Sequence, residues 1–138
     1  MDGFRCSTEL TARFNETDAQ GIIHHGVHVI WLEIARIAYL EQVAGGYSGL
    51  VASGVDVTTI EMNIRYREAV RFGDRLRIWT RCAHARGARL RFEYAVVKDG
   101  SDSLVADGWT AHACVDATTL RATRVPLELI ESLEKLES

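Results

Sequence analysis

The sequence has few of the residues that constrain a chain covalently or rigidly. Its 138 residues include a single proline, Pro126, and three widely separated cysteines, Cys6, Cys82 and Cys114, with no CxxC pair. An odd number of scattered cysteines argues against a disulfide framework and a zinc ribbon, and it favours a reducing compartment. The N-terminus has no apolar signal core, and no apolar run reaches membrane-spanning length. We therefore expect a cytoplasmic protein that does not associate with membranes.

A large net charge is also missing. The formal net charge is -3, so the molecule as a whole is not built to bind a polyanion such as nucleic acid. Arginines nevertheless crowd one segment: Arg65, Arg67, Arg71, Arg75, Arg77, Arg81, Arg86, Arg89 and Arg91. Two interpretations remain open for them, namely the solvated face of successive strands or a rim that binds a nucleotide phosphate.

Nothing in the sequence marks a domain boundary. There is no Ser/Gly-rich linker, internal repeat or low-complexity stretch, and hydrophobic residues make up 47% of the chain. That share is ample for a core that offsets chain entropy. We expect residues 1–138 to form a single domain.

The period of the hydrophobic pattern changes along the chain. Alternation over residues 8–15 predicts a strand, and from about His25 apolar residues recur at helical spacing until Gly45 and Gly46 end the helix. Residues 55–66 are rich in β-branched side chains and predict a further strand. Alternation then returns at residues 75–82, 89–96 and 109–116, the last with Trp109, Ala111 and Ala113 as its apolar side. Tight turns fit at residues 86–87 and 98–100, and a short amphipathic helix fits residues 127–137.

This order predicts an α+β fold in which a curved antiparallel sheet wraps around one long central helix. The helix is apolar around most of its circumference, which is more surface than one sheet can cover. Edge strands would also stay unpaired. Both features favour a homodimer with symmetric interfaces.

Three of the five histidines lie in the stretch GIIHHGVHVIWLEIAR, at positions 24, 25 and 28. On a helix, His24 and His28 would share a face, as metal ligands often do, and Asp18 or His25 could complete a site. The stretch lacks the glutamate of an HExxH motif, however, and its spacing fixes no third ligand. We therefore expect no metal, and packing of a satisfied His28 ring on the helix is the simpler alternative.

Asp18 stands in a loop just before the predicted helix. Its carboxylate could simply support the turn. Alternatively, the backbone N–H groups at the helix start could hold a developing oxyanion while the carboxylate acts as nucleophile or as general base toward water. Gly21 and Gly26 would allow close approach to the backbone. The second interpretation describes a compact acyl-transfer site.

The stretch FNETDAQGIIHHGVHVIWLEIAR resembles the signature of hotdog-fold acyl-CoA thioesterases of the 4-hydroxybenzoyl-CoA thioesterase family. These proteins carry T-D-x-x-G-x-V/I, then an aromatic or histidine pair, then W/F-x-E-x-A-R. The resemblance continues through MNIRYREAVRFGDRLRIWTR, RLRFEYAV and LVADGWTAHACVD, and so spans about residues 7–125. It implies a hotdog fold, hydrolysis of an acyl-CoA thioester, and a homodimer or homotetramer that binds substrate near a subunit interface.

The resemblance also assigns roles. Asp18 matches the catalytic carboxylate, and the amide of His24 or His25 matches the donor that polarises the thioester carbonyl. The remaining candidates are substrate-binding residues: Gly21, Gly26, His28, Trp31, Thr59, Arg86, Arg89 and Arg91. The three arginines are candidates for the CoA phosphates, and no cofactor is implied apart from the coenzyme A of the substrate.

Departures from the family pattern lie beside the acyl pocket. Many members read Y-H-A-N-Y where this chain has HHGVH at residues 24–28, and proline where this chain has Ala69. These changes bear on the acyl group, for which we expect a polar or aromatic structure. Three alternatives remain: a thioesterase for acyl carrier protein thioesters, an acyl-CoA-binding module, and a hydratase that pairs His25 with Asp18.

Overall fold

The computed structural model describes residues 3–43, 45–101 and 103–138. Five strands form one antiparallel sheet in the order β1-β3-β4-β5-β2. The strands are β1 (Cys6–Thr11), β2 (Val55–Tyr66), β3 (Arg75–Arg86), β4 (Arg89–Lys98) and β5 (Leu104–Asp116). The helices are α1 (Val27–Leu40), α2 (Gly46–Ala52) and α3 (Leu127–Glu137), with a 3-10 turn, η1, at Phe14–Glu16.

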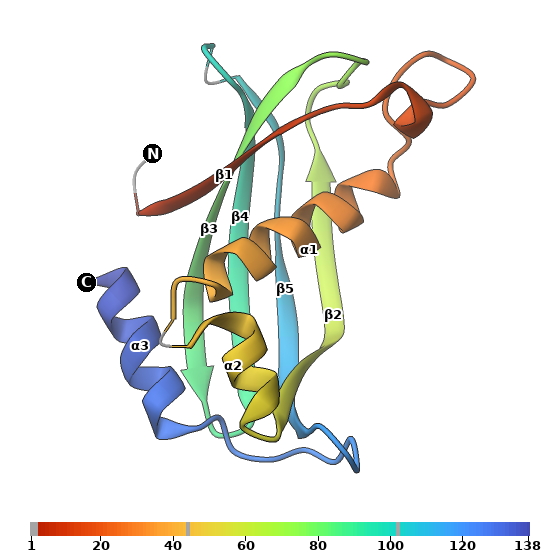
Figure 1. Cartoon of the computed structure of the whole chain (residues 1–138). Helices are drawn as coiled ribbons and strands as arrows, with labels where there is room; N and C mark the ends of the chain where they lie inside the picture. The colour runs from red at the N-terminus through yellow and green to blue at the C-terminus, as the bar shows by residue number, and fades with distance from the viewer. Residues whose placement is uncertain (1–2, 44, 102) are drawn as a thin grey trace.

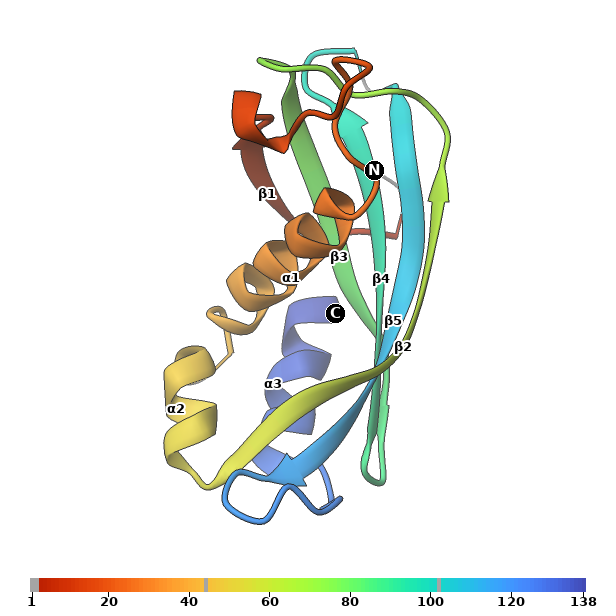
Figure 2. The same ribbon diagram turned by 90° about the vertical axis from the view of Figure 1, so that its right-hand side faces the viewer.

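The long helix α1 crosses one face of the curved sheet (Figure 1). Seen from the side, α1, α2 and α3 all lie on that same face (Figure 2). The architecture is therefore the predicted α+β arrangement of a curved antiparallel sheet around one long helix. The loop that leads into α1 lies at one end of the sheet, and the β3–β4 hairpin lies at the other end (Figure 1).

The core forms where the apolar stripe of α1 meets the strands. Trp31, Ala35 and Tyr39 repeat at four-residue spacing and are at most 2% exposed. Phe92 of β4 is fully buried and meets Tyr39 edge-on, with 5.7 Å between ring centroids. A large apolar side chain contributes about 1.5–3 kcal/mol by leaving water, so the burial of the large rings in this stripe fixes α1 on the sheet.

The two faces of β5 are the reverse of the prediction, because the residues expected to face outward are the buried ones. Thr110, His112 and Cys114 point toward the helices and are 0% exposed, whereas Trp109 is only half-buried on the outer face under the Arg91 guanidinium. The polar side chains tolerate burial because they bond one another: Thr110 Oγ1 lies 2.7 Å from His112 Nε2. Apolar alternation alone therefore assigned the inner face wrongly.

Several predicted boundaries are also corrected. The first strand ends at Thr11 rather than residue 15, because the chain turns into η1, where Arg13 N donates to Glu16 Oε1 at 2.8 Å. The helix α1 begins at Val27 rather than near His25. Its other end comes at Leu40, well before the glycine pair that we expected to end it.

The segment after α1 holds a helix that the pattern did not reveal. Gly45 has a left-handed φ of +80°, and α2 starts directly after it at Gly46. The glycine pair therefore marks the start of a second helix rather than the end of the first. In the described ranges no helix is long and apolar enough to cross a membrane.

Candidate active site

Asp18 is held in a tight turn by its own side chain. Its Oδ1 accepts a hydrogen bond from Gln20 N at 2.8 Å, and its carbonyl accepts one from Gly21 N at 3.0 Å. The turn needs the φ of +77° that Gly21 adopts. Asp18 Oδ2, in contrast, accepts no hydrogen bond from any residue that the structure describes. One carboxylate oxygen thus anchors the turn and the other remains available.

The loop around Asp18 is fixed to the rest of the fold at several points. Ile23 N donates to the Val70 carbonyl at 2.7 Å, and His24 N donates to the Glu16 carbonyl at 2.9 Å. The Glu16 carboxylate accepts a further bond from Trp31 Nε1 at 3.1 Å, which joins η1 to α1. These contacts hold the carboxylate of Asp18 in place relative to the helix start.

The backbone amides before α1 differ in what they bind. His24 N is occupied by Glu16, and Gly26 N donates to the imidazole Nδ1 of His24 at 3.0 Å. His25 N donates to no acceptor in the described part of the chain. Of the two amides predicted to polarise a carbonyl, only that of His25 is therefore without a partner.

Asp18 and this helix start open onto one cleft, which we call the Asp18 cleft. Its volume is about 410 Å³. The cleft is lined by Asp18, Gln20, Ile22, Ile23, His25, His28 and the 66–70 segment, with Tyr66, Arg67, Glu68, Ala69 and Val70. Tyr66 braces the opening, because its hydroxyl donates to the His25 carbonyl at 2.7 Å. A cavity of this size suits a small organic ligand.

His28 forms part of the inner wall of the Asp18 cleft. It is 4% exposed, and its ring meets Trp31 and Tyr66 with centroids 4.8 and 5.0 Å apart. Its Nδ1 is buried and has no hydrogen-bond partner among the residues that the structure describes. Burial, and secondarily the charge of His25, lowers the pKa of His28 to about 4. The expected packing on the helix is present, but the ring is not satisfied.

The histidine pair that suggested a metal site is not paired in space. His24 precedes α1, so the four-residue spacing does not place it on a helix face with His28. Its ring instead stacks on His25 at 4.2 Å between centroids. In residues 3–43, 45–101 and 103–138, no group of three or more His, Cys, Asp or Glu side chains is arranged to hold a metal ion.

The other predicted site residues lie at different distances from the Asp18 cleft. Trp31 is buried behind His28, and Gly26 sits beside the His24 ring, which an added Cβ would approach to 3.1 Å. Thr59 lies seven residues before Tyr66 on β2, roughly 23 Å along an extended strand. A single chain therefore does not bring Thr59 to Asp18.

The predicted CoA-binding arginines are also distant within one chain. Arg86 and Arg89 face each other across the β3–β4 hairpin, at the end of the sheet opposite the Asp18 loop (Figure 1). Arg91 lies on the outer face, with its guanidinium 4.3 Å from the Trp109 ring centroid and 3.7 Å from Glu93. Only a second copy could bring these cations to the cleft of the first.

Sequence reasoning missed the far wall of the cleft. Tyr66 and Val70 contact the helix start through the bonds to His25 and Ile23, although more than 40 residues separate these segments. A signal was present, since strand-like alternation stops at Tyr66 and the following REAV segment departs from the family pattern at Ala69. The pairing partner of that segment was not readable from the pattern.

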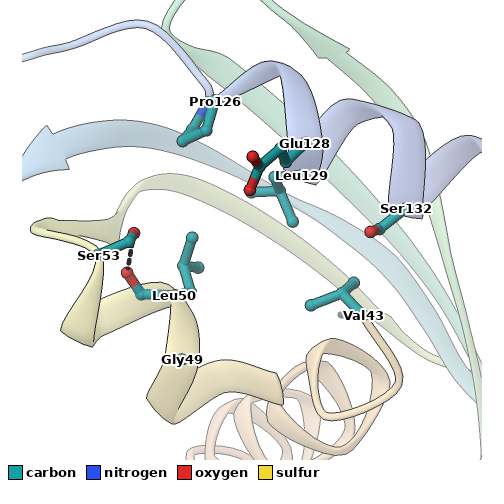
Figure 3. Close-up of a pocket in the computed structure, with 8 residues that line it drawn as sticks. All are labelled: Val43, Gly49, Leu50, Ser53, Pro126, Glu128, Leu129 and Ser132. Carbon is teal, nitrogen blue, oxygen red and sulfur yellow. Dashed lines mark hydrogen bonds between the residues drawn. The ribbon is translucent and has the colours of Figure 1, made fainter. Parts of the chain in front are cut away.

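A second cavity lies between α2 and α3 (Figure 3). It has a volume of about 90 Å³ and holds none of the predicted site residues. The nearby Ser53 hydroxyl is already bonded to the Leu50 carbonyl at 2.6 Å. This cavity is well below the roughly 300 Å³ of ordinary ligand pockets, so the Asp18 cleft is the better candidate for a site.

Comparison with known proteins identifies the family. A family model described as the thioesterase superfamily matches residues 20–105, more than half of the chain. The chain belongs to the thioesterase superfamily. The predicted hotdog-fold thioester hydrolase is thereby confirmed. Asp18 stands two residues before the matched segment, so the match does not bear on this residue.

Individual proteins match this thioesterase in sequence or in fold over most of the chain. The hypothetical protein TT1821 from Thermus thermophilus is 34% identical with a TM-score of 0.87, covering 96% of this chain and 99% of that one. Acyl-CoA thioester hydrolase YbgC from Escherichia coli O6:H1 is 25% identical over 88% of this chain and 90% of its own. DHNA-CoA thioesterase from Staphylococcus aureus shares the fold at 23% identity, with a TM-score of 0.86 and coverage of 95% and 89%.

Proposed function

We propose that this thioesterase hydrolyses an acyl-CoA thioester to a free acid and coenzyme A, with Asp18 as its catalytic carboxylate. One observation carries the proposal: Asp18 and His25 line the same cleft, and neither Asp18 Oδ2 nor the His25 N–H bonds to any residue that the structure describes. The names of the YbgC and Staphylococcus aureus relatives support coenzyme A as the carrier.

The chemistry follows from these two groups. The thioester oxygen would accept a hydrogen bond from His25 N–H, which strengthens as the carbonyl oxygen gains negative charge in the transition state. Asp18 Oδ2 would either attack the carbonyl carbon, expelling CoA thiolate and leaving an anhydride for water to cleave, or take a proton from an attacking water. Both routes add water across the thioester and release a carboxylic acid and a thiol.

Other charged groups at the Asp18 cleft are already paired. Glu68 bonds Lys98 Nζ at 3.0 Å and the Ser103 hydroxyl, and Arg67 bonds Asp107 at 3.1 Å. Glu68 is therefore a less suitable base than Asp18, because its lone pairs are engaged. This contrast supports Asp18 as the reacting carboxylate.

A homodimer is part of the proposal. Ile30 and Ile34 of α1 are 54% and 47% exposed, and Ile60 on the edge strand β2 is 47% exposed. A second copy would cover this apolar surface and pair the open edge of β2. It would also give Thr59 and the arginines Arg86, Arg89 and Arg91 a route to a neighbouring Asp18 cleft. We place the reaction in the cytosol, with no cofactor beyond the coenzyme A of the substrate.

The test is thiol release from a panel of aryl, branched and long-chain acyl-CoA substrates by wild type and by Asp18→Asn. We expect kcat/KM to fall by about 10³-fold, since the amide can neither attack nor accept a proton. Asp116→Asn is the matched control, because Asp116 also holds a turn, accepting from Thr118 N and Thr119 N at 2.8 Å, but does not line the cleft.

Wild-type turnover by Asp18→Asn would refute the assignment. Loss of an enoyl chromophore without thiol release would indicate a hydratase, and saturable binding without turnover would indicate a binding module. Faster release from acyl carrier protein than from CoA thioesters would identify the carrier protein as the natural partner. Activity that persists after thorough chelation would exclude a catalytic metal bound by the histidines.

A further inference from the structure

Two loops near the Asp18 cleft carry the same dipeptide, arginine followed by phenylalanine. Arg13 and Phe14 lie at the start of η1, and Arg71 and Phe72 lie in the turn between β2 and β3. Phe14 is 72% exposed and Phe72 is 62% exposed, and the two rings meet edge-on with 5.7 Å between centroids. We call these four residues the Arg-Phe patch. Two aromatic rings that touch each other and still face water form a concentrated apolar surface, which is typical of an interaction site.

Backbone hydrogen bonds hold the two loops of the Arg-Phe patch together. Ala12 N donates to the Asp74 carbonyl at 2.9 Å, and Gly73 N donates to the Ala12 carbonyl at 3.0 Å. Within the second loop, Arg71 N donates to Asp74 Oδ2 at 2.9 Å. The patch is therefore presented by an ordered backbone, which lowers the entropy cost of docking a partner.

The Arg-Phe patch is positively charged. The Arg13 side chain is 70% exposed, and its one ion pair among the described residues is with Glu16 at 3.6 Å. Arg71 is exposed, and its side chain forms no ion pair with the residues that the structure describes. The nearby carboxylates are engaged within the fold: Glu16 accepts from Arg13 N and Trp31 Nε1, and Asp74 accepts from Arg71 N. A partner with an acidic surface and an apolar residue would complement the patch.

The Arg-Phe patch borders the Asp18 cleft. Ile22 and Val70 line the cleft, and Arg71 follows Val70 directly. Ile22 also forms an antiparallel β-bridge with Arg71, and its carbonyl accepts a hydrogen bond from Asp18 N at 2.8 Å. A partner seated on the patch would therefore stand next to the cleft that holds the proposed catalytic carboxylate.

We propose that the Arg-Phe patch docks an acidic acyl carrier protein, whose phosphopantetheine arm delivers an acyl thioester into the Asp18 cleft. The inference rests on the proposed thioesterase function and adds a macromolecular substrate to it. Water adds across this thioester as across a CoA thioester: the carbonyl carbon gains the hydroxyl, the C–S bond breaks, and the carrier sulfur takes the proton. Coenzyme A has no protein surface with which to cover Phe14 and Phe72, whereas a carrier protein does.

A second copy of this chain fits the Arg-Phe patch less well. A symmetric contact through the patch would place Arg13 and Arg71 against the same two arginines of the other copy, and like charges repel in an interface. The apolar surface proposed for the homodimer is made by other residues, namely Ile30, Ile34 and Ile60. Charge complementarity therefore favours an acidic partner.

The test compares one acyl group on two carriers. Thiol release is measured with the acyl-CoA of the substrate panel that is hydrolysed fastest, and with the same acyl group on a purified type II acyl carrier protein. We expect Phe14→Ser and Phe72→Ser each to raise KM for the carrier thioester by about tenfold or more, with little change in kcat. The kcat/KM for the CoA thioester should stay within about twofold of wild type.

Leu127→Ser is the matched control for the lost apolar surface. Leu127 is 69% exposed at the start of α3, near the β3–β4 hairpin at the opposite end of the sheet (Figure 1). This variant should leave both thioesters unaffected. Arg13→Glu tests the charge, since it should raise KM for the carrier thioester and weaken the dependence of that KM on ionic strength. Arg124→Glu, at an exposed arginine near Leu127, should do neither.

Wild type that cleaves the CoA thioester but not the carrier thioester would overturn the inference and leave the proposed function intact. Absence of thiol release from both would instead refute the proposed function itself. Equal losses on both thioesters in Phe14→Ser and Phe72→Ser would overturn the inference, because the rings would then serve the CoA thioester as well. A change in oligomeric state of these variants by light scattering would assign the patch to contact between copies. Binding of wild type to phosphatidylglycerol vesicles that is lost in Phe14→Ser would assign it to a membrane. Either result would overturn the inference.

Discussion

Two histidines are buried in this thioesterase, and their surroundings are opposite. His28 lies on α1 at the wall of the Asp18 cleft, and His112 lies on β5 beneath the same helix. Burial keeps both neutral, with the pKa lowered to about 4 for His28 and to about 3 for His112, where the Arg36 charge adds to the effect. They share a protonation state, so any difference in role must come from their hydrogen bonds.

His112 is bonded through both nitrogens. Its Nε2 lies 2.7 Å from Thr110 Oγ1, which also bonds the Tyr94 hydroxyl at 2.7 Å, and its Nδ1 lies 3.3 Å from Thr59 Oγ1. His28 makes no such bond within the described chain. A buried polar group with complete bonding belongs to the scaffold, whereas one that borders a cleft with incomplete bonding is suited to a ligand.

The largest expected effect is the acid sensitivity that the two histidines share. The unfolded chain protonates both near pH 6.5, whereas the fold resists protonation down to about pH 4 and 3. The unfolded state therefore binds more protons in this window, and stability falls as the pH is lowered. We expect the free energy of unfolding to drop by about 4 kcal/mol between pH 6.5 and 4.5, measured by urea denaturation.

Replacing the histidines separates the two contributions. His28→Phe should remove about half of this pH dependence, since each histidine contributes at most ~1.4 kcal/mol per pH unit. An unchanged slope in that variant would show that His28 is not held neutral by the fold.

The second prediction removes one of the hydrogen bonds that satisfy the buried His112. Thr110→Val preserves shape but leaves Tyr94 Oη and His112 Nε2 without their shared partner. We expect a loss of about 2 kcal/mol in the free energy of unfolding by urea titration. Thr80→Val is the matched control, because Thr80 Oγ1 is buried and bonds to none of the described residues, so the change there should be neutral or slightly stabilising. Equal losses in both variants would mean that the bonds of Thr110 contribute nothing beyond packing.

The smallest expected effect is that of His28→Phe on the free energy of unfolding. His28→Phe breaks no hydrogen bond and replaces an orphaned polar ring with an apolar one of similar shape. At pH 7 we expect the free energy of unfolding to change by less than about 1 kcal/mol, with stabilisation the favoured direction. A loss of 3 kcal/mol or more by thermal or urea denaturation would make His28 a structural residue.

Much of the fold could be predicted because it follows from periodicity. The stripe through Trp31, Ala35 and Tyr39 specifies a helix with one buried side, and the alternation in β3 and β4 specifies the faces that receive it. The inner face of β5 could not be predicted in this way. Thr110 and His112 read as polar until their mutual bonds, and those to Tyr94 and Thr59, are known.

The site was predictable in part. Asp18 could be recognised because the turn, its carboxylate and the following helix are adjacent in the sequence. The choice of His25 over His24 as the unpaired amide depends on Glu16 and on the His24 ring, which are contacts of the folded loop. The roles assigned to Thr59 and to Arg86, Arg89 and Arg91 stay predictions, since a single chain holds them away from Asp18.

The bond between the His24 ring and Gly26 N–H has a consequence for how this enzyme could change. Gly26 N–H is adjacent to His25 N–H, and only the His24 imidazole occupies it among the described residues. A side chain at position 24 without an acceptor would release this second amide, and tighter binding of the carboxylate product by His24→Ala would reveal it. The number of backbone N–H groups that the helix start can offer to an anion would thus depend on the side chain at position 24. A single substitution at position 24 would therefore add a second backbone N–H to the oxyanion site without any change in the backbone.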